Sequence, residues 1–494
     1  MNAPLSSGKS STPMIAWVVL AIALSFFTYK AARPHPAVND GPDFAKFGSI
    51  PVLKSGRIKP LDTLSRNQLL AISGKGELSL SPEDSEDFNP PFGAKESRGK
   101  WKVERNAWLA EALFSGRGSA QRPLILVENG DVKALFGKQE ELKTKRFPAV
   151  DIIQVSEEVS RLAATAQKKE KDRVTTFDRQ VTQLDQKIRQ FLGTSATIQP
   201  PGETSYALII ERMPEIFSGV KAIVDSQPDP SAVGNEQNLS PDQRREFAAA
   251  SQLISAMRNI DQANDAIDIR PVPPKEAGGA IEDWRKFGSA ALDPARADDD
   301  NSPVLAWAKI SDGYRAIPND NGASFNAAVD DYLALIDSMN LEGTGKAKIE
   351  FWFNGFAPFA NTLPFYVIAG LLVLASWIVM TKPLNDAAFK LMVVLFIVHT
   401  IGIALRVYLS GRPPVTNLYS SSVFIGWGAI GVSLLLERWV LKNGIGSFVA
   451  AVIGVLTLII ARQLSFDGDT MEVKQAVLDS NFWLANNGYK IMIP

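Results

Sequence analysis

The residue with the widest chemical capability in this sequence is His399, one of only two histidines in 494 residues that include no cysteine. It lies nine residues into an apolar run that begins at Leu391, where a lone imidazole must find a hydrogen bond, face a cavity or ligate a metal. Neutral imidazole is also a common axial ligand of haem iron. The residues alone leave two roles open for His399: a hydrogen bond between helices, or ligation of a cofactor or ion.

The other histidine, His35, lies in the proline-rich stretch RPHPA, and we expect its side chain to be exposed. The lack of cysteine excludes disulfides, Fe–S clusters, thiolate metal sites and cysteine nucleophiles.

Two basic side chains and a tyrosine follow His399 toward one end of its apolar run. Arg406, Tyr408 and Arg412 come within the next few helical turns. Cations at this depth can hold lipid phosphates, or they can pair with a ligand that carries carboxylates, such as the propionates of haem.

The stretch GRPPVTNLYSSSVFIGWG (residues 411–428) leads from a charged, proline-rich patch into the next apolar run. The Pro-Pro pair stiffens the connection, and Thr416 or Asn417 can cap the helix that follows. Tyr419 can then lie at the interface with its hydroxyl within reach of water. Physical chemistry alone therefore interprets this stretch as the capped start of a membrane helix.

The elements that must position these residues are apolar segments of about the length needed to cross a bilayer as helices. An earlier run, Met14–Thr28, predicts an N-terminal anchor, and we favour a retained anchor over a cleaved signal peptide because no A-x-A site closes the run. The later segments are Leu363–Met380, Leu391–Leu409, Asn417–Leu436 and Asn443–Ala461.

Loop charge predicts the orientation of these helices. The short connections 381–390 and 437–442 each carry two cations, so they are expected on the cytoplasmic side. The predicted domains are an anchor (1–32), an exported, periplasmic domain (33–354), a segment of four transmembrane helices (355–464) and an exported tail (465–494). The predicted fold class is a mixed membrane protein whose exported domain is mainly α, of the α+β type.

Within the exported domain, IPVLKSGRIKPLDTLSRNQLL predicts two short strands that turn at Ser55-Gly56, then a helix capped by Asp62 or Thr63. Residues 151–192 predict a long amphipathic helix or helical hairpin, broken near QKKEKDR and ended by Gly193. This element packs on its own domain or forms a coiled coil with a partner. Residues 227–303 predict loops around short helices.

The formal net charge of −1 and the absence of a basic stripe argue against nucleic-acid binding.

Three motifs resemble the CcsA family of cytochrome c biogenesis proteins, the membrane part of the System II haem-attachment machinery, in its long bacterial form. They are HTIGIALRVYLSGRPPVTNLYSSSVFIGWG (399–428), DTMEVKQAVLDSNFWL (469–484) and PVLKSGRIKPLDTLSRNQLL (51–70). Pro414, Asn417, Leu418 and Tyr419 match the outer-loop motif of the family, in which Ser420 replaces a common Glu. Ser480, Asn481, Trp483 and Leu484 match the second motif.

The resemblance implies a protein of the bacterial inner, cytoplasmic membrane that handles or delivers haem for cytochrome c maturation. Its implied cofactor is b-type haem in transit, and its implied partners are haem, apocytochrome c, other membrane subunits of a cytochrome c assembly complex, and the lipid bilayer. His399 becomes the candidate metal ligand. The implied cofactor-binding residues are His399, Arg406, Asn417, Tyr419 and Trp483.

The sequence lacks two features of the CcsA family that are expected to bind haem. Asn487 stands near the place of a haem-ligating histidine, and the W-G-x-F-W-x-W-D haem loop is missing, so we expect a copy truncated at its C-terminus. The sequence therefore does not decide whether this chain alone attaches haem as an enzyme. The alternative is a membrane-anchored scaffold that binds apocytochrome or a partner subunit without haem. A transporter is disfavoured because the helices carry no paired ionisable residues.

Overall fold

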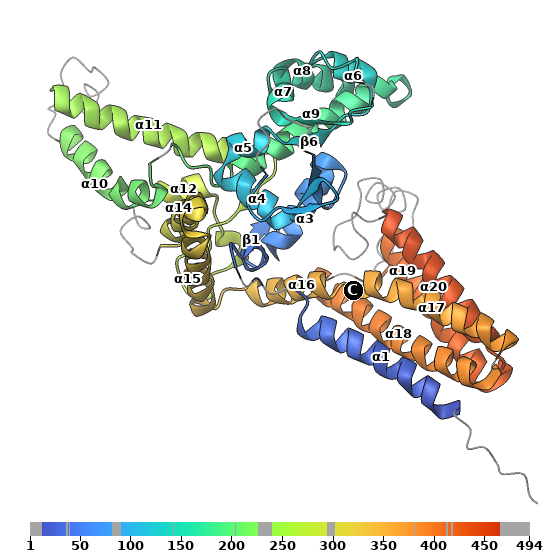
Figure 1. The fold of residues 1–494 in the computed structure, drawn as a ribbon. Helices are drawn as coiled ribbons and strands as arrows, with labels where there is room; N and C mark the ends of the chain where they lie inside the picture. The colour runs from blue at the N-terminus through green and yellow to red at the C-terminus, as the bar shows by residue number, and fades with distance from the viewer. Residues whose placement is uncertain are drawn as a thin grey trace, which may run out of the picture. The chain divides into compact units, whose positions relative to one another are not determined.

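The computed structural model describes residues 12–464 except 36–37, 39, 82–89, 142, 203, 226–239, 294–301, 380, 412 and 416–417. The chain divides into two compact units. We call residues 1–36 and 349–494 the helical unit and residues 37–348 the mixed unit. Figure 1 shows the course of the chain through both.

The helical unit holds apolar helices, and five helices in the described part of the chain are long and apolar enough to cross a membrane. Helix α1 lies along α18, while α17 packs against both α18 and α20 (Figure 1). The elements are α1 (Thr12–Ala32), α16 (Thr344–Phe356, which contains the boundary between the units), α17 (Pro358–Ile378), α18 (Thr381–Ser410), α19 (Leu418–Leu436), the π-helical turn η6 (Glu437–Leu441) and α20 (Ile445–Leu464).

The predicted apolar segments are confirmed as helices, but the two predicted connections between them are wrong in detail. Helix α18 begins at Thr381, so residues 381–390 form its first turns and not a loop. Pro383 is tolerated there because the first turn of a helix leaves its N–H groups unpaired anyway. Residues 437–441 continue α19 as a π-helical turn, and Lys442 ends it with a positive φ of 55°.

The mixed unit combines helices with three small antiparallel sheets in its described part, ordered β2-β1-β8, β3-β5-β4 and β6-β7. Its strands are β1 (Pro51–Lys54), β2 (Arg57–Pro60), β3 (Leu78–Leu80), β4 (Lys95–Ser97), β5 (Lys100–Val103), β6 (Pro123–Leu126), β7 (Arg146–Pro148) and β8 (Ile269–Arg270). Its helices are α2 (Phe44–Phe47), α3 (Leu61–Ser73), α4 (Arg105–Phe114), α5 (Gly116–Ala120), α6 (Gly130–Ala134), α7 (Ala149–Ile153), α8 (Ser156–Gln167), α9 (Thr176–Ala196), α10 (Tyr206–Asp225), α11 (Pro241–Asn264), α12 (Phe287–Ala291), α14 (Pro303–Asp320) and α15 (Ala323–Met339).

The predicted hairpin near residue 55 is confirmed, and its turn is the left-handed kind that suits the twist of paired strands. Ser55 and Gly56 have φ values of 54° and 72°. The predicted cap of the next helix is wrong, because α3 begins at Leu61 after Pro60, without a side-chain cap. Asp62 is buried in the first turn, where it accepts hydrogen bonds from Arg105 Nε at 2.9 Å and Asn106 Nδ2 at 3.2 Å.

The predicted helical hairpin near residues 151–192 is confirmed as α8 and α9, with the break at the predicted place. Thr175 and Asp178 form a capping box that starts α9. The apolar side chains of α9 lie in the core of the mixed unit, which supports packing on its own domain. Gly193 does not end the helix. It lies within α9 at a close contact, because a Cβ there would meet the Ile267 side chain at 2.8 Å.

The prediction of loops around short helices in residues 227–303 is confirmed over residues 265–293, where short elements such as α12 alternate with turns, and is wrong over residues 241–264. Residues 241–264 form the 24-residue helix α11. Ser240 and Gln243 make a capping box, and Pro241 occupies the first turn, where its missing N–H costs nothing. Turn-forming residues before the helix therefore serve as its start signal.

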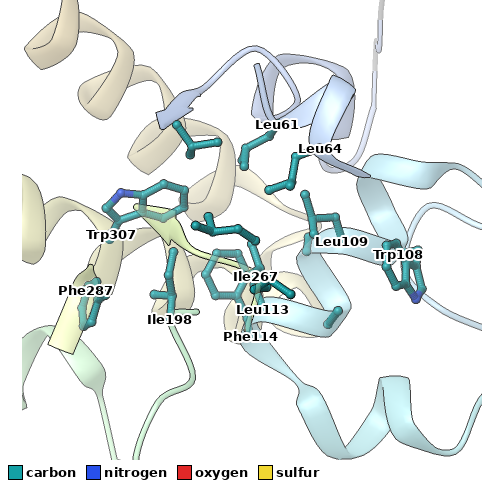
Figure 2. Packing of buried hydrophobic residues seen from close by; sticks show 14 of the residues in the cluster. Leu61, Leu64, Trp108, Leu109, Leu113, Phe114, Ile198, Ile267, Phe287 and Trp307 are labelled. Atoms are coloured by element: carbon teal, nitrogen blue, oxygen red, sulfur yellow. The ribbon is translucent and has the colours of Figure 1, made fainter. Parts of the chain in front are cut away.

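The core of the mixed unit gathers residues that are far apart in the sequence. Figure 2 shows side chains from α3, α4, α12 and α14 packed together with Ile198 and Ile267. Trp108, Phe287 and Trp307 are fully buried in this cluster. Large aromatic side chains of this kind contribute much of the hydrophobic free energy of folding.

Candidate functional site

His399 lies in the middle of α18 and is fully buried within the helical unit. Its Nδ1 atom is 3.2 Å from the hydroxyl of Tyr366, which is also fully buried and comes from α17. A hydroxyl can donate to or accept from a ring nitrogen, so this contact fixes the orientation of the ring and is compatible with either tautomer. The α17–α18 contact therefore holds the imidazole in place.

The second ring nitrogen of His399 is different. Nε2 is buried and has no hydrogen-bond partner among the described residues. The backbone of Val423 in α19 approaches the ring as a hydrogen-bonding group, although no hydrogen bond of ordinary geometry reaches Nε2. Buried polar atoms in native proteins nearly always have a partner, so an orphaned nitrogen of this kind points to a ligand or a water.

Aromatic rings surround the imidazole. The ring of Phe359 is 5.3 Å from that of His399, measured between centroids, in an edge-on arrangement. Gly402 makes this approach possible, because a Cβ at that position would lie 2.9 Å from the Phe359 ring. Gly454 of α20 admits Tyr366 in the same way, at 2.8 Å. The imidazole thus lies in an apolar environment built by close helix packing.

Thr400, the neighbour of His399, links α18 to α19. Its Oγ1 accepts a hydrogen bond from Trp427 Nε1 at 2.8 Å. Trp427 also stacks on Phe396 at 5.6 Å between ring centroids. The N–H of Trp427 is therefore used for a contact between helices of the bundle.

Arg406 and Tyr419, two of the residues predicted for the site, are brought together by the structure. The guanidinium carbon of Arg406 lies 4.4 Å from the centroid of the Tyr419 ring, a cation–π contact. Tyr419 is fully buried, so the prediction that its hydroxyl lies within reach of water is wrong. Arg406 follows His399 by seven residues, which places both on one face of α18, roughly 10 Å apart along the axis.

Other predicted residues lie outside the part of the chain that the structure describes. These are Asn417 and Trp483 of the site, together with Arg412, Thr416, Asn487 and the motif at 469–484. Tyr408 is described and is about half exposed, at 52%.

The expectation that His35 is exposed is wrong. Its ring stacks on Phe351 of the helical unit, with centroids 3.8 Å apart, and its Nε2 lies 2.9 Å from the carbonyl oxygen of Phe351. Gly355 leaves room for this contact, since a Cβ there would meet Nε2 at 2.7 Å. His35 therefore holds the segment that follows α1 against α16.

Sequence reasoning missed Tyr366, the partner of His399. A hydroxyl-bearing side chain inside the apolar segment 363–380 was the available signal, because a buried tyrosine needs a hydrogen-bond partner. No sequence spacing relates residue 366 to residue 399, so only the packing of α17 on α18 reveals the pair.

The donor set restricts the kind of metal group that fits. The described residues include no cluster of three or more His, Asp or Glu side chains able to hold an ion together. A haem brings its own ring nitrogens to iron, so one imidazole suffices for an axial position. The orphaned Nε2 of His399 in an apolar bundle fits that requirement, and Arg406 on the same helix face fits a carboxylate at the edge of such a group.

Comparison with known proteins yields one short similarity. No protein-family model matches the chain. A segment of 100 residues is 34% identical to Protein NrfI of Wolinella succinogenes, covering 19% of this chain and 11% of that protein. The chain thus matches only a small part of its relative's length.

Proposed function

We propose that this protein handles or delivers haem for cytochrome c maturation, as part of a membrane cytochrome c assembly complex. The observation that carries the proposal is His399, a buried imidazole held by Tyr366 through Nδ1 and without a hydrogen-bond partner at Nε2 in the described structure. Nε2 is the atom that would ligate iron. The short similarity to Protein NrfI supports the same class of function.

The proposal gives each residue of the site a role. In this proposal the Tyr366 oxygen accepts a hydrogen bond from Nδ1–H of His399, and that tautomer leaves the Nε2 lone pair available. Arg406 pairs with a haem carboxylate two turns along the same helix face, and Tyr419 positions Arg406 through its ring. Haem, when bound, supplies the porphyrin that is passed on to apocytochrome c. The predicted export of residues 33–354 to the periplasm belongs to this proposal.

Haem spectroscopy on the purified full chain tests the proposal. We expect bound haem with a low-spin Soret band, and we expect His399→Ala to lose the band while the protein stays folded by circular dichroism. His35→Ala is the matched control, since His35 is the other histidine of the chain and its Nε2 is already engaged with Phe351. An equal loss in both variants, or a colourless wild-type protein, would count against haem handling.

A second function has one observation in its favour. Phe359 and Tyr366 pack against the His399 ring so closely that the Tyr366–His399 hydrogen bond can serve helix association alone. The chain would then be a membrane-anchored scaffold whose exported domain binds apocytochrome or a partner subunit. A colourless preparation that still captures a purified apocytochrome c would favour this function.

A further inference from the structure

A second polar feature lies at the end of the helical unit where α17 ends and α18 and α20 begin. It is a pocket of about 780 Å³. Its lining combines one aromatic, one aliphatic and five polar or charged side chains: Trp377, Lys382, Asn385, Asp386, Lys442, Asn443 and Ile445. The haem proposal uses none of these residues.

Hydrogen bonds hold the walls of the pocket in place. The buried carboxylate of Glu437 accepts hydrogen bonds from Gly444 N at 2.6 Å and Gly446 N at 2.9 Å, which fixes the connection that carries Lys442. Trp377 Nε1 donates to the carbonyl oxygen of Asn443 at 2.9 Å and ties α17 to the same connection. The pocket is therefore preorganised and does not depend on a mobile loop.

Lys442 occupies an unusual backbone position. Its φ of 55° lies in the left-handed region, where glycine or asparagine is the ordinary choice at the end of a helix. A lysine in this conformation carries some backbone strain, and its ammonium group lies at the pocket. Such strain in a preorganised wall is often associated with ligand binding.

The charges of the pocket have both signs. Lys382 and Lys442 form no ion pair within the described part of the chain, although Asp386 lines the same pocket. The Oδ1 atom of Asn385 is buried and has no hydrogen-bond partner there. The lining thus offers two cations for an anion, and a carboxylate and an amide oxygen for a hydrogen-bond donor.

Apolar side chains next to the pocket are exposed in the protein alone. Ile378 and Val379 at the end of α17 are 82% and 75% exposed, and Trp439 and Val440 of η6 are 70% and 68% exposed. All four belong to, or adjoin, segments apolar enough to cross a membrane. Acyl chains are the natural cover for such side chains at the end of a membrane helix.

We propose that this pocket binds the headgroup of a phospholipid that carries a hydrogen-bond donor beyond its phosphate, namely phosphatidylglycerol or phosphatidylethanolamine. Lys382 and Lys442 hold the phosphate, and Asp386 and Asn385 accept from the glycerol hydroxyls or the ammonium group. The acyl chains lie on the exposed apolar side chains of α17 and η6. Basic pockets between transmembrane helices are typical lipid-headgroup sites.

The test uses the full chain in nanodiscs of defined lipid and measures lipid retained by native mass spectrometry. We expect one phosphatidylglycerol or phosphatidylethanolamine to be retained and phosphatidylcholine to be released. Lys382→Gln and Lys442→Gln should each weaken retention about fivefold, the contribution expected of one cation at a membrane surface. Arg438→Gln is the matched control, because Arg438 is exposed in η6 and does not line the pocket.

Asp386→Asn separates the two headgroups, since only the ammonium of phosphatidylethanolamine depends on a carboxylate charge. Equal retention of phosphatidylcholine, or unchanged retention in the two lysine variants, would overturn the proposal. So would protection from thermal unfolding by inorganic phosphate equal to that by lipid. Circular dichroism on each variant distinguishes lost lipid from lost fold, and a colourless protein leaves this test unaffected.

Discussion

The hydroxyl of Tyr366 lies 3.2 Å from Nδ1 of His399, and this single contact joins α17 to α18 at the only buried histidine of the described structure. It satisfies one ring nitrogen and leaves the other, Nε2, without a partner in the described residues. Helix packing thereby fixes the orientation of the imidazole and leaves Nε2 for a ligand or a water.

Tyr366→Phe removes that hydrogen bond and little else. We expect haem affinity to fall about tenfold or more, as is usual when a metal-ligating histidine loses its supporting partner. The free energy of unfolding should fall by about 1 kcal/mol. Haem titration followed at the Soret band measures the first quantity. Tyr29→Phe, at an exposed tyrosine of α1, should leave both unchanged, and identical behaviour of the two variants would refute the supporting role.

Gly402→Ala tests the close packing around the site. The added Cβ would lie 2.9 Å from the Phe359 ring, so the ring must move and the free energy of unfolding should fall by about 1–3 kcal/mol. Gly428→Ala in α19 is the matched control, because nothing lies within 4 Å of the new Cβ. There the gain in helix propensity should stabilise the protein by about 0.5–1 kcal/mol. Reversible unfolding in mixed detergent micelles measures both, and equal effects would contradict the packing argument.

A double-mutant cycle on Arg406→Gln and Tyr419→Leu measures the cation–π contact. We expect a coupling free energy of about 0.5–2 kcal/mol, since the guanidinium lies over a buried ring 4.4 Å away. Arg438→Gln combined with Tyr419→Leu is the control cycle, because Arg438 lies at the opposite end of α19 from Tyr419. A coupling near zero in the first cycle would show that the contact contributes nothing.

The low pKa of Asp178 leads us to expect that the mixed unit loses stability in acid. Hydrogen bonds from Lys169 and from the backbone and side chain of Thr175 lower the pKa of Asp178 to about 2, below that of an unfolded chain. Its stabilising contribution is therefore complete above the unfolded pKa of about 4 and is lost as pH falls from about 4 to about 2. Asp178→Asn should flatten the pH dependence of thermal unfolding in that window. Lys169→Gln, which removes the first of these partners, should flatten it in part, and an unchanged slope in Asp178→Asn would exclude this origin.

Local patterns were enough to predict several elements. The turn at Ser55-Gly56 follows from residues that tolerate positive φ, and the apolar runs that became α17 to α20 follow from their length. Each signal is contained within one stretch of consecutive residues. Helix limits were predicted less well, because Pro383 and Pro241 suit the first turn of a helix as well as a loop.

The sequence by itself determined that His399 and Arg406 share one face of one apolar helix, since helical geometry relates residues seven positions apart. Only the tertiary structure decided that the Tyr366 hydroxyl contacts Nδ1 of His399 and that Tyr419 is buried beneath Arg406. It also decided that Lys382 and Lys442 line one pocket. Those pairs join different helices, and their distances depend on how side chains of many sizes interlock. Periodicity along one segment carries no information about that packing.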